Sequence, residues 1–274
     1  MKKWILATFL VTVSFGLVAC SENAEDVFTK ALEASEAMES AEVSMKLDQE
    51  LSMGEEGSIT IASDMEGSVI NDPLAMHQKG TMSMGMNMQG MESEVPLDME
   101  TEIYLVEDEM YMFESLTGQW IKADSSVIPI ETLTANQPDV SEQLKMMEKY
   151  VEDFEFEAVD EEYVFKLTAD GEGFKELSQE MLEDYLPQEL TAELGDISQL
   201  LEDMEIKTLY IELVIDNKTY DLKEYNMDME MSMTVEGETV DIVQHVGSEY
   251  KNINTIDSIE VPQEVKDSAV NGGL

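Results

Sequence analysis

Most of the chain alternates between apolar and polar residues, the pattern of β-strands that bury one face. Apolar residues take every second position from Val43 to Leu47, and the alternation resumes around 59–65 and 209–215. The most regular runs place methionines at alternate positions: Met82, Met84, Met86 and Met88, and later Met227, Met229, Met231 and Met233. Clean alternation favours antiparallel strands with one wet face, and turns at 54–57 and 71–73 predict hairpins between them.

Helical spacing replaces this alternation in two parts of the chain. Residues 23–39 carry apolar residues on one helix face, with Asn23 as the expected N-cap. The central part shows further helical stripes at 140–151, 174–185 and 190–204, and a hairpin is expected around Asp160 within 154–167. Strands, then helices, then strands predict an α+β protein in which the helices cover one face of an antiparallel meander.

The expected organisation is a single domain over residues 24–266, followed by a frayed tail at 267–274. No Pro- or Gly-rich linker divides the chain. The two methionine strands suggest two similar halves, although short alternating stretches are weak signals of a repeat.

Residues 1–19 have the organisation of a secretory signal, with Lys2 and Lys3 before an apolar run. The sequence Leu17-Val18-Ala19-Cys20 at its end resembles a bacterial lipobox. This resemblance implies cleavage between Ala19 and Cys20, and a diacylglycerol on the Cys20 sulfur. Residues 20–23 would then be a lipidated N-terminus and short tether to the extracytoplasmic face of the cell membrane. The alternative is an ordinary signal peptide with a chance cysteine.

Charge narrows the possible partners. The chain has 61 Asp and Glu against 15 basic residues, all of them Lys, and a formal net charge of −46. Such an acidic chain is not expected to bind nucleic acid, because phosphate neutralisation needs clustered cations. Screening by salt weakens the repulsion between acidic residues. The acidity therefore fits a salty or alkaline exterior, or else drift in an acid-rich proteome.

Candidate catalytic chemistry is sparse, so we do not expect an enzyme, and we predict no cofactor and no metal site. The chain has one Cys and two His, and neither His77 nor His245 lies in a recognisable motif. Carboxylates are so abundant that pairing them has no diagnostic value. Both histidines are expected to be surface residues.

The methionines allow three interpretations. They are core residues of inward-facing strands, or they also form a binding surface, or they bind Cu(I), which favours thioether ligands. Residues i and i+2 of a strand are about 6.6 Å apart, so a copper site would need methionines from neighbouring strands. The candidate face for an apolar ligand comprises the eight methionines of the two runs: Met82, Met84, Met86, Met88, Met227, Met229, Met231 and Met233.

The lipobox, the N-terminal helix, the long strands and the central helical block resemble the LolA/LppX/LprG-like bacterial lipoproteins, and more closely the uncharacterised lipoproteins of Bacillus relatives. The resemblance lies in residues 110–112 followed by 118–122, and in 213–216 followed by 218–220. It implies a curved, half-barrel antiparallel sheet whose concave face is covered by helices and holds lipid chains. No functional residue set transfers with it.

Three function classes remain open. The first is a membrane-anchored carrier or binder of an apolar, lipid-like ligand on the methionine-lined face. The second is a structural or interaction lipoprotein of the envelope with a filled core and no ligand. The third is a copper-handling lipoprotein. The expected partners are the membrane, through the lipid on Cys20, and the apolar ligand.

The lipobox makes a direct prediction about anchoring. Cys20→Ala should abolish incorporation of a labelled fatty acid, because Cys20 supplies the chain's only thiol. It should also leave an uncleaved precursor or a released protein. Cys20→Ala protein that still carries labelled fatty acid after a carbonate wash of the membranes would contradict lipidation at this residue.

Overall fold

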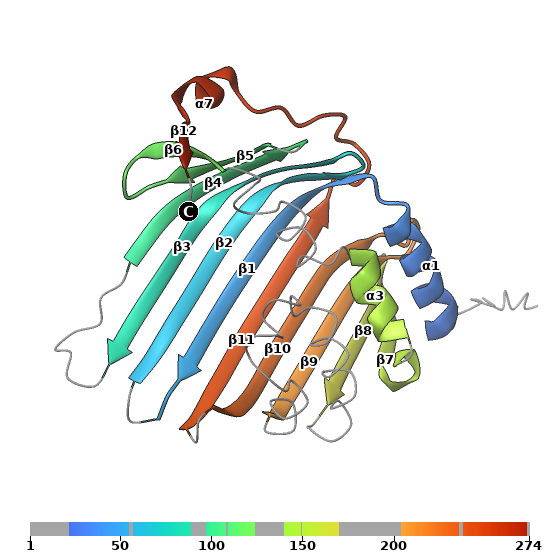
Figure 1. The fold of residues 1–274 in the computed structure, drawn as a ribbon. Helices are drawn as coiled ribbons and strands as arrows, with labels where there is room; N and C mark the ends of the chain where they lie inside the picture. The colour runs from blue at the N-terminus through green and yellow to red at the C-terminus, as the bar shows by residue number, and fades with distance from the viewer. Residues whose placement is uncertain are drawn as a thin grey trace, which may run out of the picture.

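The computed structural model describes residues 22–54, 57–88, 97–107, 109–123, 140–148, 150–169, 204–235 and 238–272. These residues form one open, curved sheet of 12 strands in the order β12-β6-β5-β4-β3-β2-β1-β11-β10-β9-β8-β7 (Figure 1). All neighbouring strands are antiparallel except β12 and β6. The predicted antiparallel sheet is therefore confirmed, as two meanders, β1 to β6 and β7 to β11, that meet where β1 pairs with β11.

The strands are long in the middle of the sheet and short at its edges. The N-terminal group is β1 (Ser40–Ser52), β2 (Gly57–Asn71), β3 (Leu74–Met88), β4 (Leu97–Val106), β5 (Glu109–Glu114) and β6 (Gln119–Ala123). The C-terminal group is β7 (Glu155–Val159), β8 (Glu162–Ala169), β9 (Met204–Asp216), β10 (Leu222–Val235), β11 (Glu238–Lys251) and β12 (Val270–Gly272). Pairing of β1 with β11 joins the two groups into one sheet.

Helix α1 (Ala24–Glu36) begins where the sequence predicts it. The side chain of Asn23 accepts a hydrogen bond of 2.8 Å from the backbone N–H of Asp26, which satisfies one of the free donors of the first turn. Val27, Phe28 and Ala31 form the buried side of this helix. The N-cap and the apolar stripe together account for its start and its orientation.

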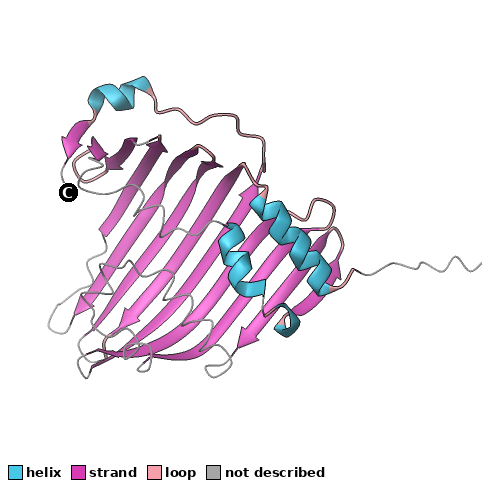
Figure 2. Ribbon diagram, turned by 45° about the vertical axis from the view of Figure 1, so that its right-hand side comes forward, coloured by secondary structure: helices cyan, strands magenta, loops and turns pink. Residues whose placement is uncertain are grey.

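The main core lies between the helices and one end of the sheet. Helices α1 and α3 (Val140–Glu148) and the 3-10 turn η1 (Val151–Asp153) pack against β8, β9 and β10 (Figures 1 and 2). Phe28 and Phe165 meet edge to face, with ring centroids 5.7 Å apart. The side chains of Leu144, Ile211 and Leu213 are fully buried there. Burial of these apolar side chains is the main favourable contribution to folding at this end.

A second, smaller core lies at the other end and on the other face. Helix α7 (Gln263–Ser268) places Val265, with Val261 just before it, against Tyr104 of β4 and Tyr111 of β5. In the strand register these tyrosines point away from the side on which α1 packs. The described helices thus lie on both faces of the sheet. That helices cover the concave face stays a prediction.

Of two further expectations, the structure confirms one and corrects the other. The hairpin expected around Asp160 is confirmed as β7 and β8. The fraying expected over 267–274 does not extend to Val270–Gly272, because this segment pairs with β6 as β12. The signal segment 1–19, the stripe at 174–185 and residues 190–203 of the last stripe lie outside the described residues. Met204, which was expected to end that helical stripe, instead begins strand β9, where it pairs with Met233. No helix in the described part of the chain is both long and apolar enough to cross a membrane.

The close approach of β2 and β3 depends on glycine, which generates a stability prediction. A Cβ atom added at Gly80 would lie 1.9 Å from the backbone oxygen of Asp64, and backbone cannot move aside as a side chain can. Gly80→Ala should lower the free energy of unfolding by about 1–3 kcal/mol in thermal or denaturant melts. Gly247→Ala on β11 is the matched control, because its nearest neighbour is a side-chain atom, Asn226 Oδ1, at 3.2 Å. Equal stability of the two variants would contradict a steric requirement for glycine at position 80.

Candidate functional site: an uncharged face of the sheet

Antiparallel register sorts the side chains of the central strands onto two chemically different faces. Residues directly opposite each other on paired strands point to the same side. On the side that carries α1, the rows from β3 through β2, β1, β11 and β10 to β9 contain no charged residue. We call this side the apolar face. Its four rows, each written in the order β3, β2, β1, β11, β10, β9, are Gly80, Met65, Met45, Ser248, Tyr225, Leu213; Met82, Ser63, Leu47, Val246, Met227, Ile211; Met84, Ile61, Gln49, Gln244, Met229, Leu209; and Met86, Ile59, Leu51, Ile242, Met231, Ile206.

The structure brings both predicted methionine runs onto this apolar face. Seven of the eight have described side chains, and all seven are half-buried: Met82, Met84, Met86, Met227, Met229, Met231 and Met233. Met88 ends β3 in the same alternation, but its side chain lies outside the described part. Met227, Met229 and Met231 also pack against the main core. The two runs therefore belong to one continuous surface rather than to two separate cores.

The arrangement does not gather the two runs around one ion. Three strands, β2, β1 and β11, separate β3 from β10, so the runs are about 19 Å apart at the usual strand spacing. The methionine that lies opposite Met82 on a paired strand is Met99 of β4, which belongs to neither run. Among the described residues, no group of three or more His, Cys, Asp or Glu side chains converges as a metal site.

Sequence reasoning missed the polar pair at the centre of the apolar face. Gln49 of β1 and Gln244 of β11 lie directly opposite each other. The Nε2 of Gln49 donates a hydrogen bond of 3.2 Å to the Oε1 of Gln244. Because β1 and β11 are almost two hundred residues apart in the chain, alternation within either strand gives no signal of this pairing.

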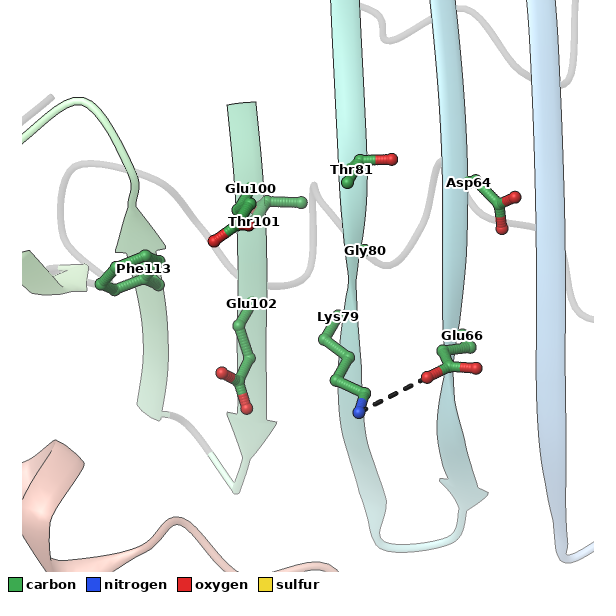
Figure 3. Close-up of a pocket in the computed structure, with 9 residues that line it drawn as sticks. All are labelled: Asp64, Glu66, Lys79, Gly80, Thr81, Glu100, Thr101, Glu102 and Phe113. Carbon is green, nitrogen blue, oxygen red and sulfur yellow. Dashed lines mark ion pairs between the residues drawn. The ribbon is translucent and has the colours of Figure 1, made fainter. Parts of the chain in front are cut away.

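The opposite side of the sheet is strongly acidic. Its rows include Lys46, Asp48, Glu50, Asp64, Asp228, Glu230 and His245. A hollow of about 410 Å³ on this acidic face lies over β2, β3 and β4 (Figure 3). Asp64, Glu66, Glu100 and Glu102 line it, and Lys79 forms an ion pair of 3.4 Å with Glu66. Carboxylates outnumber the single cation, so this hollow is unsuited to an apolar ligand.

Both histidines lie on the acidic face, and each has a carboxylate partner. The His77 ring stacks on Tyr104 at 4.1 Å, and its Nε2 lies 2.8 Å from Glu102 Oε1. Tyr104 donates a 3.0 Å hydrogen bond to the same oxygen. Burial, with this hydrogen bond to Glu102, raises the pKa of Tyr104 to about 12. His245 Nδ1 lies 2.6 Å from Asp228 Oδ1. Each contact joins side chains of two neighbouring strands, β3 with β4 and β11 with β10.

Glu22, two positions after Cys20, is held against the sheet by hydrogen bonds and an ion pair. Tyr163 and Tyr220 donate hydrogen bonds of 3.0 and 2.9 Å to Glu22 Oε2, and Lys30 forms an ion pair with the same carboxylate. The Lys30 ammonium also lies 4.5 Å from the centroid of the Tyr220 ring. We call these four residues the Glu22 cluster. Cys20 itself lies outside the described residues, so its lipidation remains a prediction.

Hydrogen bonding within the Glu22 cluster favours its charged forms. The hydrogen bond from Lys30, followed by that from Tyr220, lowers the pKa of Glu22. The same contact with Glu22 raises the pKa of Lys30. A carboxyl group whose pKa is lower in the folded state stabilises the fold above its unfolded pKa, and loses this contribution as the pH falls through the folded pKa.

Replacement of Glu22 therefore has a pH-dependent cost. Glu22→Gln should lower Tm at pH 7 by about 2 °C, because it removes the charge that Lys30 and two tyrosines bind. The difference from wild type should shrink as the pH falls below the usual carboxyl pKa of about 4.3, and it should vanish only below the lowered pKa of Glu22 in the folded protein, where wild-type Glu22 is protonated too. Thermal melts from pH 2 to 7 measure this. Glu25→Gln, an exposed neighbour, is the control, and an equal effect in both variants would contradict a specific cluster.

Comparison with solved structures gives low sequence identities and TM-scores below 0.5. LprF from Mycobacterium bovis is 14% identical with a TM-score of 0.38, covering 87% of this chain and 96% of LprF. Lipovitellin, in a structure concerned with its lipid–protein interactions, is 8% identical with a TM-score of 0.35, covering 85% of this chain and 26% of that chain. A DUF1329 family protein from Desulfovibrio piger is 7% identical with a TM-score of 0.24, covering 86% and 93% of the two chains.

No curated protein matches this chain in sequence. The expected likeness to lipoproteins of Bacillus relatives remains a prediction. A family model does match, and it extends from the N-cap of α1 to the start of β12. Because residues 23–270 match the family of unknown function DUF6612, the chain belongs to that family.

Proposed function

We propose that the protein is a membrane-anchored extracytoplasmic lipoprotein that holds the acyl chain of a lipid-like ligand on its apolar face. The role is binding or carriage, without catalysis. The observation that carries the proposal is the uncharged, methionine-rich surface shared by β3, β2, β1, β11, β10 and β9. Its side chains are largely half-buried rather than fully enclosed.

The dimensions of the apolar face suit a chain-like ligand. Six strands and four alternating rows span about 24 Å by 20 Å at ordinary strand spacings. Contiguous apolar patches above a few hundred Å² mark sites of interaction in proteins, because their exposure to water is unfavourable. The described helices α1 and α3 lie over the β8–β10 end, and the middle of β1, β2 and β3 has no described helix above it (Figure 2).

The side-chain chemistry supports an acyl chain as the occupant. Methionine is flexible and polarizable, so a surface rich in it adapts to ligands of varied shape. A hydrocarbon chain needs no hydrogen-bond partners, and the apolar face offers few. The competing interpretation, a structural lipoprotein with a filled core, predicts that the apolar face binds no acyl ligand.

Filling the apolar face should separate binding from folding. Membranes with the full chain would be irradiated with a diazirine-bearing alkane, and the labelled peptides mapped by mass spectrometry. Label is expected on β1, β3 and β10. Met84→Trp or Met229→Trp should reduce it about five-fold, the equivalent of about 1 kcal/mol, because the larger ring occupies the ligand's space. Both variants should still melt cooperatively.

A tryptophan on the other side of the sheet provides the control. Val243 is 50% exposed and faces the acidic side, opposite Glu50 and Glu230. Val243→Trp should therefore leave the labelling unchanged. Absence of label from the apolar face of the wild-type protein, with no lipid found in its native mass spectrum, would favour the filled-core structural lipoprotein.

A further inference from the structure

The apolar face has a polar centre that the acyl-binding role does not use. The amides of Gln49 and Gln244 share one hydrogen bond, Nε2 to Oε1, at 3.2 Å. Apolar side chains surround the pair in its own row and along both strands: Ile61, Met229, Leu47, Leu51, Ile242 and Val246. Both glutamines are half-buried.

This pair retains hydrogen-bonding capacity. A primary amide has two N–H donors and an oxygen with two lone pairs, and one mutual hydrogen bond uses a small part of that inventory. Exchange of the O and N positions within either amide would change which glutamine donates, but the pair would still offer both a donor and an acceptor. No other described residue has a hydrogen bond to either amide. A bound molecule that covers the pair must satisfy these groups, or the complex loses affinity.

The surroundings select the charge of that molecule. The central rows of the apolar face contain no Lys, and the lysines Lys46 of β1 and Lys79 of β3 point to the acidic face. An anionic headgroup at the pair would lie among apolar side chains without a counter-ion, which is strongly unfavourable. A cationic headgroup would also lack a partner there, since the carboxylates are on the far side of the sheet.

We propose that Gln49 and Gln244 form a polar subsite that selects acyl lipids with an uncharged, hydrogen-bonding end, such as the hydroxyls and ester of a monoacylglycerol. This inference rests on the proposed function, because it names the class of lipid that the apolar face accepts. The ligand's hydroxyl donates to the free amide oxygen and accepts from the free amide N–H, while its chain lies along the methionine rows.

Three photoreactive probes with the same diazirine-bearing chain test the subsite. They are a monoacylglycerol, an alkyl sulfate and an alkane, each applied to membranes that contain the full chain. Labelling of the apolar face is normalised to that of total membrane protein. The monoacylglycerol should label wild type about five-fold more than the alkyl sulfate or the alkane, as expected for one or two additional neutral hydrogen bonds.

The variants isolate the two amides. Gln49→Leu with Gln244→Leu should remove the advantage of the monoacylglycerol over the alkane, while labelling by the alkane is retained or increased. Gln78→Leu is the matched control, since Gln78 lies on the same side of β3 but away from the pair, opposite Ile103. Gln244→Met alone is the second test if the double variant no longer melts cooperatively.

The outcomes separate the subsite from the acyl-binding role. Equal labelling of wild type by all three probes, unchanged in the double variant, would overturn the subsite. The glutamines would then serve to hold β1 and β11 in register, and the proposed function would stand. Failure of every probe to label the apolar face would instead contradict the proposed function itself. Loss of the monoacylglycerol advantage in Gln78→Leu as well would also overturn the assignment to the pair.

Discussion

Strand register is the constraint on which the rest of the structure depends. Successive side chains of a strand point to opposite faces, and the pairing from β3 to β9 keeps this phase across every central strand. As a result Leu47 and Met227 share one side while Asp48 and Asp228 share the other. An uncharged face and an acidic face of one sheet follow from this pairing together with the alternation of apolar and charged residues within each strand. The core under α1, the methionine surface and the glutamine pair all depend on it.

The acidic face shows how a chain of such net charge remains compact. A few lysines face carboxylates on neighbouring strands, as in the ion pairs Lys79–Glu66 at 3.4 Å and Lys166–Glu212 at 3.8 Å. Exposed pairs of this kind contribute little individually. The placement of the carboxylates matters more. Because they are confined to one solvent-exposed surface, salt can screen the repulsion between them. The carboxylates of these central strands are thereby kept off the apolar side.

Features set by local pattern were predictable, and features set by long-range pairing were not. Asn23, as an N-cap residue, predicts the start of α1. The alternation around Met84 and Met229 correctly predicts which side of each strand is apolar. The contact of β1 with β11 has no local signal, so the partnership of Gln49 with Gln244 was invisible. The position of α7 and the pairing of β12 were missed for the same reason, since a short C-terminal segment owes its structure to Tyr104 and β6 rather than to its own periodicity.

Strict alternation also restricts how strand lengths can change during evolution. Deletion of one residue within β1 would move Asp48 and Glu50 to the side of α1 and the methionines, and would turn Leu47 or Leu51 towards the carboxylates. Deletion of two residues keeps the phase and shortens the sheet by one row. Insertions and deletions in this family should therefore gather in turns, or occur in even numbers within strands, so that the parity of strand length is itself under selection.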